Sequence, residues 1–236
     1  MRQVPLPLVP QPLASLDSFV AGSNALLLAQ LRAQVPPASP VYLWGPSGCG
    51  KTHLLSGLGQ ACLQAGRRVL RFDPDSGPEH EVDATVGLLI LDDVQRWDAQ
   101  AQQLAFAWMV EAQSHGVVWA AAGPTPPIDL PLRDDLRSRL AWGHVHAVLP
   151  LSEAETRAVL RREADRRGVH LGDEVMDYLL SRFARDLTHL MALLDRLDEY
   201  AMSHARALTV PLLRQMLAES PLRPDQEIQR GLELDA

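Results

Sequence analysis

The feature that most constrains the fold of this 236-residue chain is one glycine-rich run. In order, the run reads Gly45, Pro46, Ser47, Gly48, Cys49, Gly50, Lys51 and Thr52. It follows the apolar segment 41–44, which has the composition of a strand, and it precedes the helical segment 52–64. The run matches the pattern G-x-x-x-x-G-K-[ST] in full, in the strand–loop–helix context that this pattern requires. We therefore expect a strand of a parallel sheet that leads directly into a helix.

This run has the chemistry of a phosphate-binding loop. Its glycines let the backbone wrap so that N–H groups point inward at phosphate oxygens, and the following helix adds its N-terminal dipole. Lys51 would reach the β and γ phosphates, and the Thr52 hydroxyl would coordinate Mg²⁺. Glycine-rich turns also precede helices that bind nothing, but the Lys-Thr pair favours a ligand. The sequence thus predicts a site for ADP or ATP with Mg²⁺ at residues 45–52, with His53 beside it.

Two acidic residues, Asp92 and Asp93, follow the apolar run 88–91. A phosphate-binding loop needs a carboxylate across the site to hold Mg²⁺ and to orient water. In parallel sheets, ligands bind at the carboxyl ends of the strands, where these two acids would emerge. Two aspartates can also simply end a strand and begin a turn. With the loop upstream, we assign Asp92 to the metal and Asp93 to polarising the attacking water.

Strand-type and helical segments alternate along the first part of the chain, which predicts an α/β fold with a doubly wound parallel sheet flanked by helices. The expected strands are 41–44, 68–72, 86–91, 117–122 and 145–149, and the expected helices are 25–31, 52–64, 99–114 and one within 133–142. After Pro150 the pattern changes to helices only. Ser152 and Glu155 form a capping box, and further helices are expected at 174–184, 186–204 and 210–218, the last with Thr209 as N-cap.

These patterns divide the chain into four parts. Residues 1–14 form a proline-rich extended segment, 15–150 the α/β domain, 151–220 a small all-helical lid, and 221–236 a flexible tail.

Bulk composition narrows the class of protein. Hydrophobic residues make up 47% of the chain and charged residues 22%, as in a globular protein with a sizeable core. The net charge of −7 argues against a broad nucleic-acid footprint. One of the two cysteines lies within the loop, which disfavours a disulfide and favours a reducing, cytoplasmic location. The N-terminus does not read as a signal peptide, and no stretch is apolar for long enough to span a membrane.

Four stretches in order resemble the DnaA-type AAA+ ATPases, over roughly residues 16–218. They are 16–24, the loop 45–52, 89–95, and 136–140 with Trp142 and Gly143. The resemblance implies an AAA+ domain whose segment 16–24, with Val20, lines the adenine pocket. It also implies that Arg139 is an arginine finger, which acts in trans on a neighbour's γ-phosphate. An ion pair with Asp134 or Asp135 is the alternative for Arg139.

The initiators of this family carry a DNA-binding helix-turn-helix and a long N-terminal domain, and we find neither pattern here. The chain is more similar to a short regulatory branch of the family. That similarity implies docking on the β sliding clamp of DNA polymerase III through Gln3, Leu6 and Leu8. It implies stimulated ATP hydrolysis by DnaA, which negatively regulates replication initiation, and no sequence-specific DNA binding or membrane contact.

Two departures from the family pattern concern hydrolysis by this chain itself. The stretch 120–124, where the family places a polar sensor, has no polar side chain. Thr188 stands where the family's lid carries a sensor arginine, although Arg185, almost one helical turn earlier, could substitute. We therefore expect weak intrinsic ATPase activity. The competing hypothesis is a self-assembling AAA+ ATPase or loader, a homo-oligomer that hydrolyses ATP itself.

Overall fold

The computed structural model describes residues 14–72, 82–183, 187–204 and 206–219. The chain forms two compact units, one made of Met1–Gly45 with Lys51–Val148 and the other of Pro46–Gly50 with Leu149–Ala236. Within the described residues, no helix is long and apolar enough to cross a membrane.

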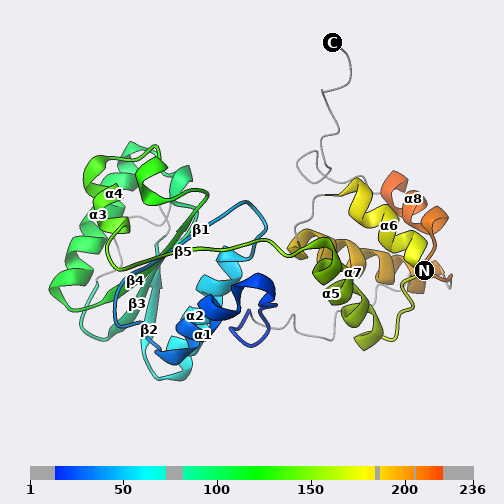
Figure 1. Cartoon of the computed structure of the whole chain (residues 1–236), viewed down its shortest axis with the longest axis horizontal. Coiled ribbons are helices and arrows are strands. Elements are labelled where there is room, and N and C mark those ends of the chain that lie inside the picture. Colours follow the sequence, from blue (N-terminus) through cyan, green and yellow to red (C-terminus); the bar gives the residue numbers. More distant parts are fainter. Residues whose placement is uncertain (1–13, 73–81, 184–186, 205, 220–236) are drawn as a thin grey trace, which may run out of the picture. The chain divides into compact units, whose positions relative to one another are not determined.

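The described part of the first unit contains a five-stranded parallel sheet (Figure 1). The strands are β1 (Val41–Trp44), β2 (Arg68–Arg71), β3 (Val86–Leu91), β4 (Val118–Gly123) and β5 (His144–Ala147), in the order β2-β3-β4-β1-β5. Every residue of β3 is buried, whereas the edge strands β2 and β5 are largely exposed. This burial explains why β3 is apolar throughout. The predicted parallel sheet is confirmed.

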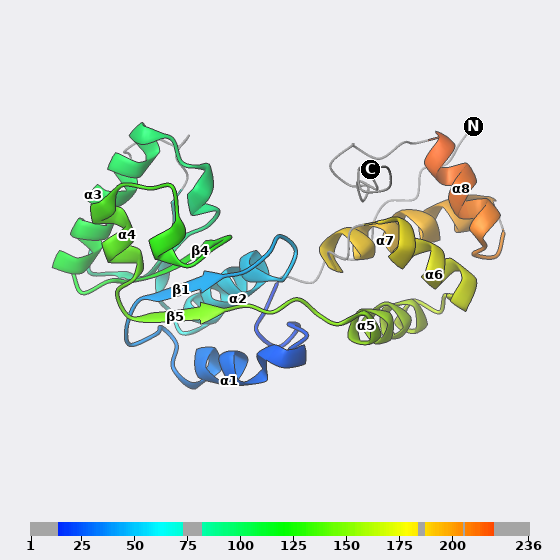
Figure 2. The same ribbon diagram turned by 45° about the horizontal axis from the view of Figure 1, so that its top comes forward.

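Helices cover both faces of the sheet (Figures 1 and 2). Helices α1 (Ala25–Ala33) and α2 (Lys51–Gln64) lie on one face, and α3 (Ala99–Ser114) and α4 (Asp134–Leu140) on the other. Short 3₁₀ turns, η1 (Gly22–Asn24), η2 (Val94–Arg96) and η3 (Pro127–Asp129), precede α1, α3 and α4, respectively. Helix α2 is followed by a turn at Gly66, which has a φ of 75°, and the Arg67 N–H donates to the Cys62 carbonyl at 3.0 Å.

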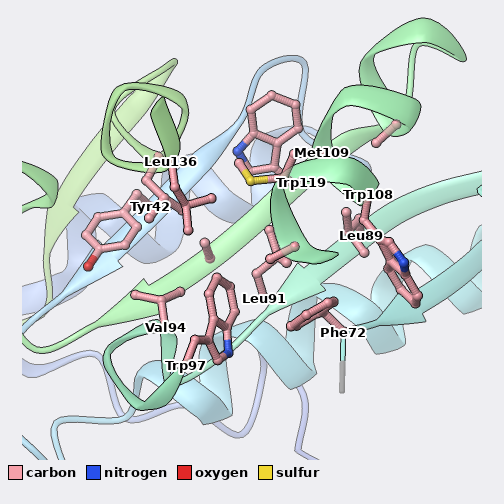
Figure 3. Packing of buried hydrophobic residues seen from close by; sticks show 14 of the residues in the cluster. Tyr42, Phe72, Leu89, Leu91, Val94, Trp97, Trp108, Met109, Trp119 and Leu136 are labelled. Carbon is pink, nitrogen blue, oxygen red and sulfur yellow. The ribbon is translucent and has the colours of Figure 1, made fainter. Parts of the chain in front are cut away.

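An aromatic-rich core lies between the sheet and helix α3 (Figure 3). The Phe72 ring makes edge contacts with Trp97 at 5.0 Å and with Trp108 at 5.4 Å between ring centroids. Leu91, at the end of β3, and Val94, in η2, are fully buried in the same cluster. This packing fixes the backbone on both sides of the acidic pair, which lies between these two residues.

The part of the second unit from Leu149 onward is built from helices where it is described. Its helices are α5 (Glu153–Arg166), α6 (Asp173–Arg182), α7 (Leu187–His204) and α8 (Val210–Glu219), and they share one apolar core. The predicted capping box is confirmed, because the Ser152 side chain accepts from the Glu155 N–H while the Glu155 side chain accepts from the Ser152 N–H. Thr209 Oγ1 accepts from the Leu212 N–H at 3.4 Å, as expected for the N-cap of α8.

Helix α6 ends earlier than the predicted 174–184. Phe183 is already extended, with φ −110° and ψ 154°, and its side chain is fully buried in the helical core. Burying this aromatic ring in the core stabilises the unit more than further residues of helix would.

Candidate nucleotide site and arginine surface

The loop after β1 has a backbone that requires glycine. Gly48 and Gly50 have φ values of 74° and 98°, a region that side-chain-bearing residues rarely adopt. The loop then enters α2, whose first turn contains no acidic residue. The free N–H groups of a helix N-terminus attract anions, and no carboxylate of that turn competes here. The Lys51 Nζ donates to the Gly45 carbonyl at 2.8 Å. The lysine therefore lies against the loop with which it is expected to bind phosphates.

Asp92 and Asp93 leave the sheet at its carboxyl edge, directly after β3. All strands are parallel, so this is also the edge from which the loop leaves β1. The Asp92 Oδ1 accepts from the Asp93 N–H at 2.9 Å. Asp93 itself adopts the left-handed region, with φ 49° and ψ 44°, which is uncommon outside glycine. The sequence predicted the two acids at this edge but gave no sign of the unusual backbone.

Neighbouring polar groups hold the exposed Asp93 carboxylate. The Gln95 Nε2 donates to the Asp93 Oδ1 at 3.1 Å, and the Arg96 guanidinium lies 3.7 Å from the Asp93 Oδ2. Mg²⁺ in nucleotide sites usually takes one or two carboxylates, phosphate oxygens and several waters. The Thr52 hydroxyl and the Asp92 carboxylate are oxygen donors of the kind this ion prefers, so the donor set fits the predicted metal.

His53 contacts the segment that precedes α1. Its Nε2 lies 3.0 Å from both the Ser18 Oγ and the Ser15 carbonyl, and its ring centroid is 5.7 Å from that of Phe19. Val20 follows in this segment and is half-buried. His53 therefore joins the start of α2 to the segment expected to line an adenine pocket. The sequence predicted His53 as a nucleotide contact but not this anchoring role.

Arg139, on α4, lies among aromatic and amide groups. Its Nη1 donates to the Gln113 Oε1 at 2.8 Å, and its guanidinium carbon lies 4.8 Å from the Phe106 ring centroid and 5.5 Å from that of Trp142. The Trp142 ring in turn stacks on Trp119 at 6.4 Å between centroids. We call this group of Arg139, Gln113, Phe106 and Trp142 the arginine surface.

The alternative ion pair for Arg139 is wrong. Asp134 pairs with Arg137, and Asp135 pairs with Arg133 at 2.6 Å. Sequence reasoning missed Phe106 and Gln113, which belong to no motif. They lie two helical turns apart on α3 and therefore share a helix face, a signal that could have suggested a common partner.

The polar sensor position remains apolar in the fold. Ala120, Ala121 and Ala122 are fully buried in β4 and pair with β1. At Gly123, which ends the strand, a Cβ would lie 2.2 Å from the Tyr42 hydroxyl, so there is no room for a side chain at this position.

Four other predicted site residues lie outside the described residues, as does the tail 221–236. They are Gln3, Leu6, Leu8 and Arg185.

A glycine-rich loop that follows β1, two acids that follow β3 of the same parallel sheet, and a helical part from Leu149 onward are the features of an AAA+ protein. Solved structures share the fold. Domain III of the replication initiation protein DnaA from Thermotoga maritima matches with a TM-score of 0.72 and 22% identity, over 89% of this chain and 98% of that one. AMPPCP-bound DnaA from Aquifex aeolicus matches with a TM-score of 0.63 and 22% identity, over 80% and 66% of the two chains.

Two sequence comparisons give the family. The model described as "Hda, lid domain" matches residues 153–217. An uncharacterised protein of Haemophilus influenzae is 30% identical over 230 residues, which cover 92% of this chain and 98% of that protein. The chain belongs to the Hda-type, DnaA-like AAA+ proteins.

Proposed function

We propose that this protein is a nucleotide-bound regulator of replication initiation. In this proposal it docks on the β sliding clamp and presents Arg139 to ATP held by DnaA, whose hydrolysis then prevents re-initiation. Membership of the Hda-type family supports a connection to DnaA. The arginine surface supports the proposed mechanism, in which Arg139 contacts ATP held by DnaA.

The single observation that carries the proposal is how Arg139 is held. Rings and an amide surround its guanidinium, and within the described residues no carboxylate pairs with it. Its positive charge is therefore not neutralised by a neighbouring acid. An arginine finger works by placing such a charge against the γ-phosphate as negative charge develops in the transition state. A guanidinium held by π faces and one amide suits that role better than one held in an ion pair.

The protein's own nucleotide has a structural role in this proposal. Lys51 and the loop would bind the phosphates of ADP or ATP, and Thr52 and Asp92 would hold Mg²⁺. The Aquifex DnaA, described as AMPPCP-bound, supports adenine nucleotide as the ligand of this fold. The buried alanines of β4 offer no polar group to the γ-phosphate, which favours slow hydrolysis at this site.

Docking on the clamp is assigned to Gln3, Leu6 and Leu8. Prolines around them limit the conformations of the free segment, so little entropy is lost when it binds. The two leucines would fill an apolar pocket while the Gln3 amide hydrogen-bonds at its edge.

The decisive experiment measures ATP hydrolysis by DnaA in the presence of this protein and DNA-loaded clamp. Arg139→Ala is expected to lower the stimulated rate by about 10³-fold or more, as for arginine fingers elsewhere. Arg137→Ala, on the same helix but paired with Asp134, is the matched control and is expected to stimulate normally. A clamp pull-down and the measured nucleotide content should be equal for all three proteins. Full stimulation by Arg139→Ala would contradict the proposal.

The alternative is an ATPase that turns over its own nucleotide. The observation that favours it is the presence of both acids, Asp92 and Asp93, at the sheet edge. The ATPase rate of the purified protein alone separates the two functions. An intrinsic rate as high as that of the stimulated DnaA reaction would favour the alternative.

A further inference from the structure

A cavity of about 240 Å³ lies on the α/β unit, between helix α1 and the edge strand β5. Its lining includes two imidazoles of β5, His144 and His146, and the amides of Gln30 and Gln34 at the end of α1. Neither the loop 45–52 nor Asp92 lines it, so this cavity is separate from the nucleotide site.

Both histidines line this cavity because of the strand geometry. Alternate residues of a strand point to the same face, so His144 and His146 share one face of β5. Their ring centroids are 5.9 Å apart, and their planes differ by 25°. On the neighbouring strand their register partners are Val41 and Leu43, both buried, whereas β5 is the edge strand and its histidines lie at the rim of the sheet.

The two rings have uncommitted nitrogens. Among the described residues, the two rings contact each other, and no side-chain hydrogen bond or ion pair is found at the ring of His144 or of His146. In the part of the chain that the structure describes, no carboxylate, lysine or arginine lines the cavity. Neutral imidazole is the form that binds transition metals.

The two rings lie close enough to share one cation after they rotate. With Zn–N bonds of about 2.0–2.1 Å and about 1.1 Å from a ring nitrogen to its centroid, two rings on one tetrahedral ion have centroids about 5 Å apart. The observed 5.9 Å is somewhat longer and the ring planes are nearly parallel, so the proposal requires the rings to turn toward a common point. The His144 side chain is exposed, which leaves room for that rotation.

We propose that His144 and His146 form a binding site for a divalent transition-metal cation of the Zn²⁺ type, completed by water and an amide oxygen from Gln30 or Gln34. The described residues contain no group of three or more His, Cys, Asp or Glu side chains placed to hold a metal. The site is therefore open and exchangeable, unlike a closed four-ligand zinc site. Imidazole selects Zn²⁺, Ni²⁺ and Cu²⁺, whereas Mg²⁺ prefers oxygen, so this site would not compete for the Mg²⁺ of the nucleotide.

The test is calorimetric titration of Zn²⁺ into protein that carries no affinity tag, in excess Mg²⁺ so that oxygen sites are occupied. Wild type is expected to bind one Zn²⁺ at this site. His144→Ala and His146→Ala are each expected to weaken that binding by at least about tenfold, or ~1.4 kcal/mol, and the double variant should lose it. His115→Ala removes an exposed histidine elsewhere in the same unit and should bind as wild type does.

Unchanged tryptophan fluorescence would show that each variant keeps its fold, and the exposed His144 is the safer of the two substitutions. No Zn²⁺ binding by wild type would overturn the proposal. Equal Zn²⁺ affinity for wild type and the double variant would overturn it as well. Neither result bears on the function proposed above, because His144 and His146 have no part in it.

Discussion

At the residue scale, Phe106 is the group most open to test, because its ring faces the Arg139 guanidinium at 4.8 Å. A cation–π contact at a partly exposed site contributes about 0.5–2 kcal/mol. If the ring positions Arg139, Phe106→Leu, which keeps the bulk and loses the π face, should lower stimulated DnaA hydrolysis by about 2- to 30-fold. Phe106→Tyr keeps the face and should restore the rate.

The readouts for Phe106 separate positioning from simple packing. The ring also packs against the core of the α/β unit, so the unfolding midpoint of each variant is measured beside the rate. Positioning predicts a lower maximal rate for Phe106→Leu with clamp binding unchanged. A rate equal to wild type in this variant would leave the ring with a packing role alone.

The single residues of the site show where sequence reasoning stops. The positions of Lys51, Thr52, Asp92 and Asp93 followed from local patterns, because a strand, a loop and a helix in succession fix where each side chain leaves the sheet. The partners of Arg139 did not follow, since Phe106 and Gln113 come from a different helix and only tertiary packing brings them near. The left-handed backbone of Asp93 could not be predicted from the sequence either, because aspartate tolerates several backbone conformations.

At the element scale, most boundaries follow the sequence because strong local signals mark them. The strand 86–91 and the helix 99–114 match β3 and α3 in full, since one is a continuous apolar run and the other follows an N-cap, Asp98. The last strand differs, because β5 spans His144–Ala147 instead of the predicted 145–149. As an edge strand with little burial, it carries a weaker apolar pattern.

The capping box of α5 gives a prediction at this scale. Ser152→Ala removes the acceptor for the Glu155 N–H and should destabilise the helical unit by about 1 kcal/mol. Hydrogen bonds from the Ser152 side chain and then its backbone N–H lower the pKa of Glu155. A lowered carboxyl pKa contributes stability above the ordinary pKa of glutamate, and that contribution is lost as the pH falls through the lowered value. The effect of Ser152→Ala should therefore be larger at pH 7 than in acid.

The chain offers its own control for this variant. All five tryptophans, Trp44, Trp97, Trp108, Trp119 and Trp142, belong to the α/β unit. Circular dichroism reports on both units, whereas tryptophan fluorescence reports on the α/β unit. Ser152→Ala should shift part of the circular dichroism transition and leave the fluorescence midpoint in place. A matching shift in fluorescence would show that the effect of the cap is not confined to the helical unit.

At the scale of the whole molecule, the same fluorescence signal tests whether the nucleotide site is real. A ligand that binds only the folded state stabilises it by about 2.7 kcal/mol at a concentration 100 times its Kd. For a protein of this size, each kcal/mol raises the unfolding midpoint by about 2–4 °C, so ADP with Mg²⁺ should raise it by about 5–11 °C. Lys51→Ala removes the principal charge contact with the phosphates and should abolish most of that rise.

Arg96→Ala, which replaces an exposed arginine beside Asp93, is the control, because it keeps the loop intact and should retain the rise in the unfolding midpoint. AMP, which lacks the β-phosphate that Lys51 is expected to reach, should stabilise the protein less than ADP does. Equal shifts for AMP and ADP, or an undiminished shift in Lys51→Ala, would show that the loop at residues 45–52 does not hold the nucleotide phosphates.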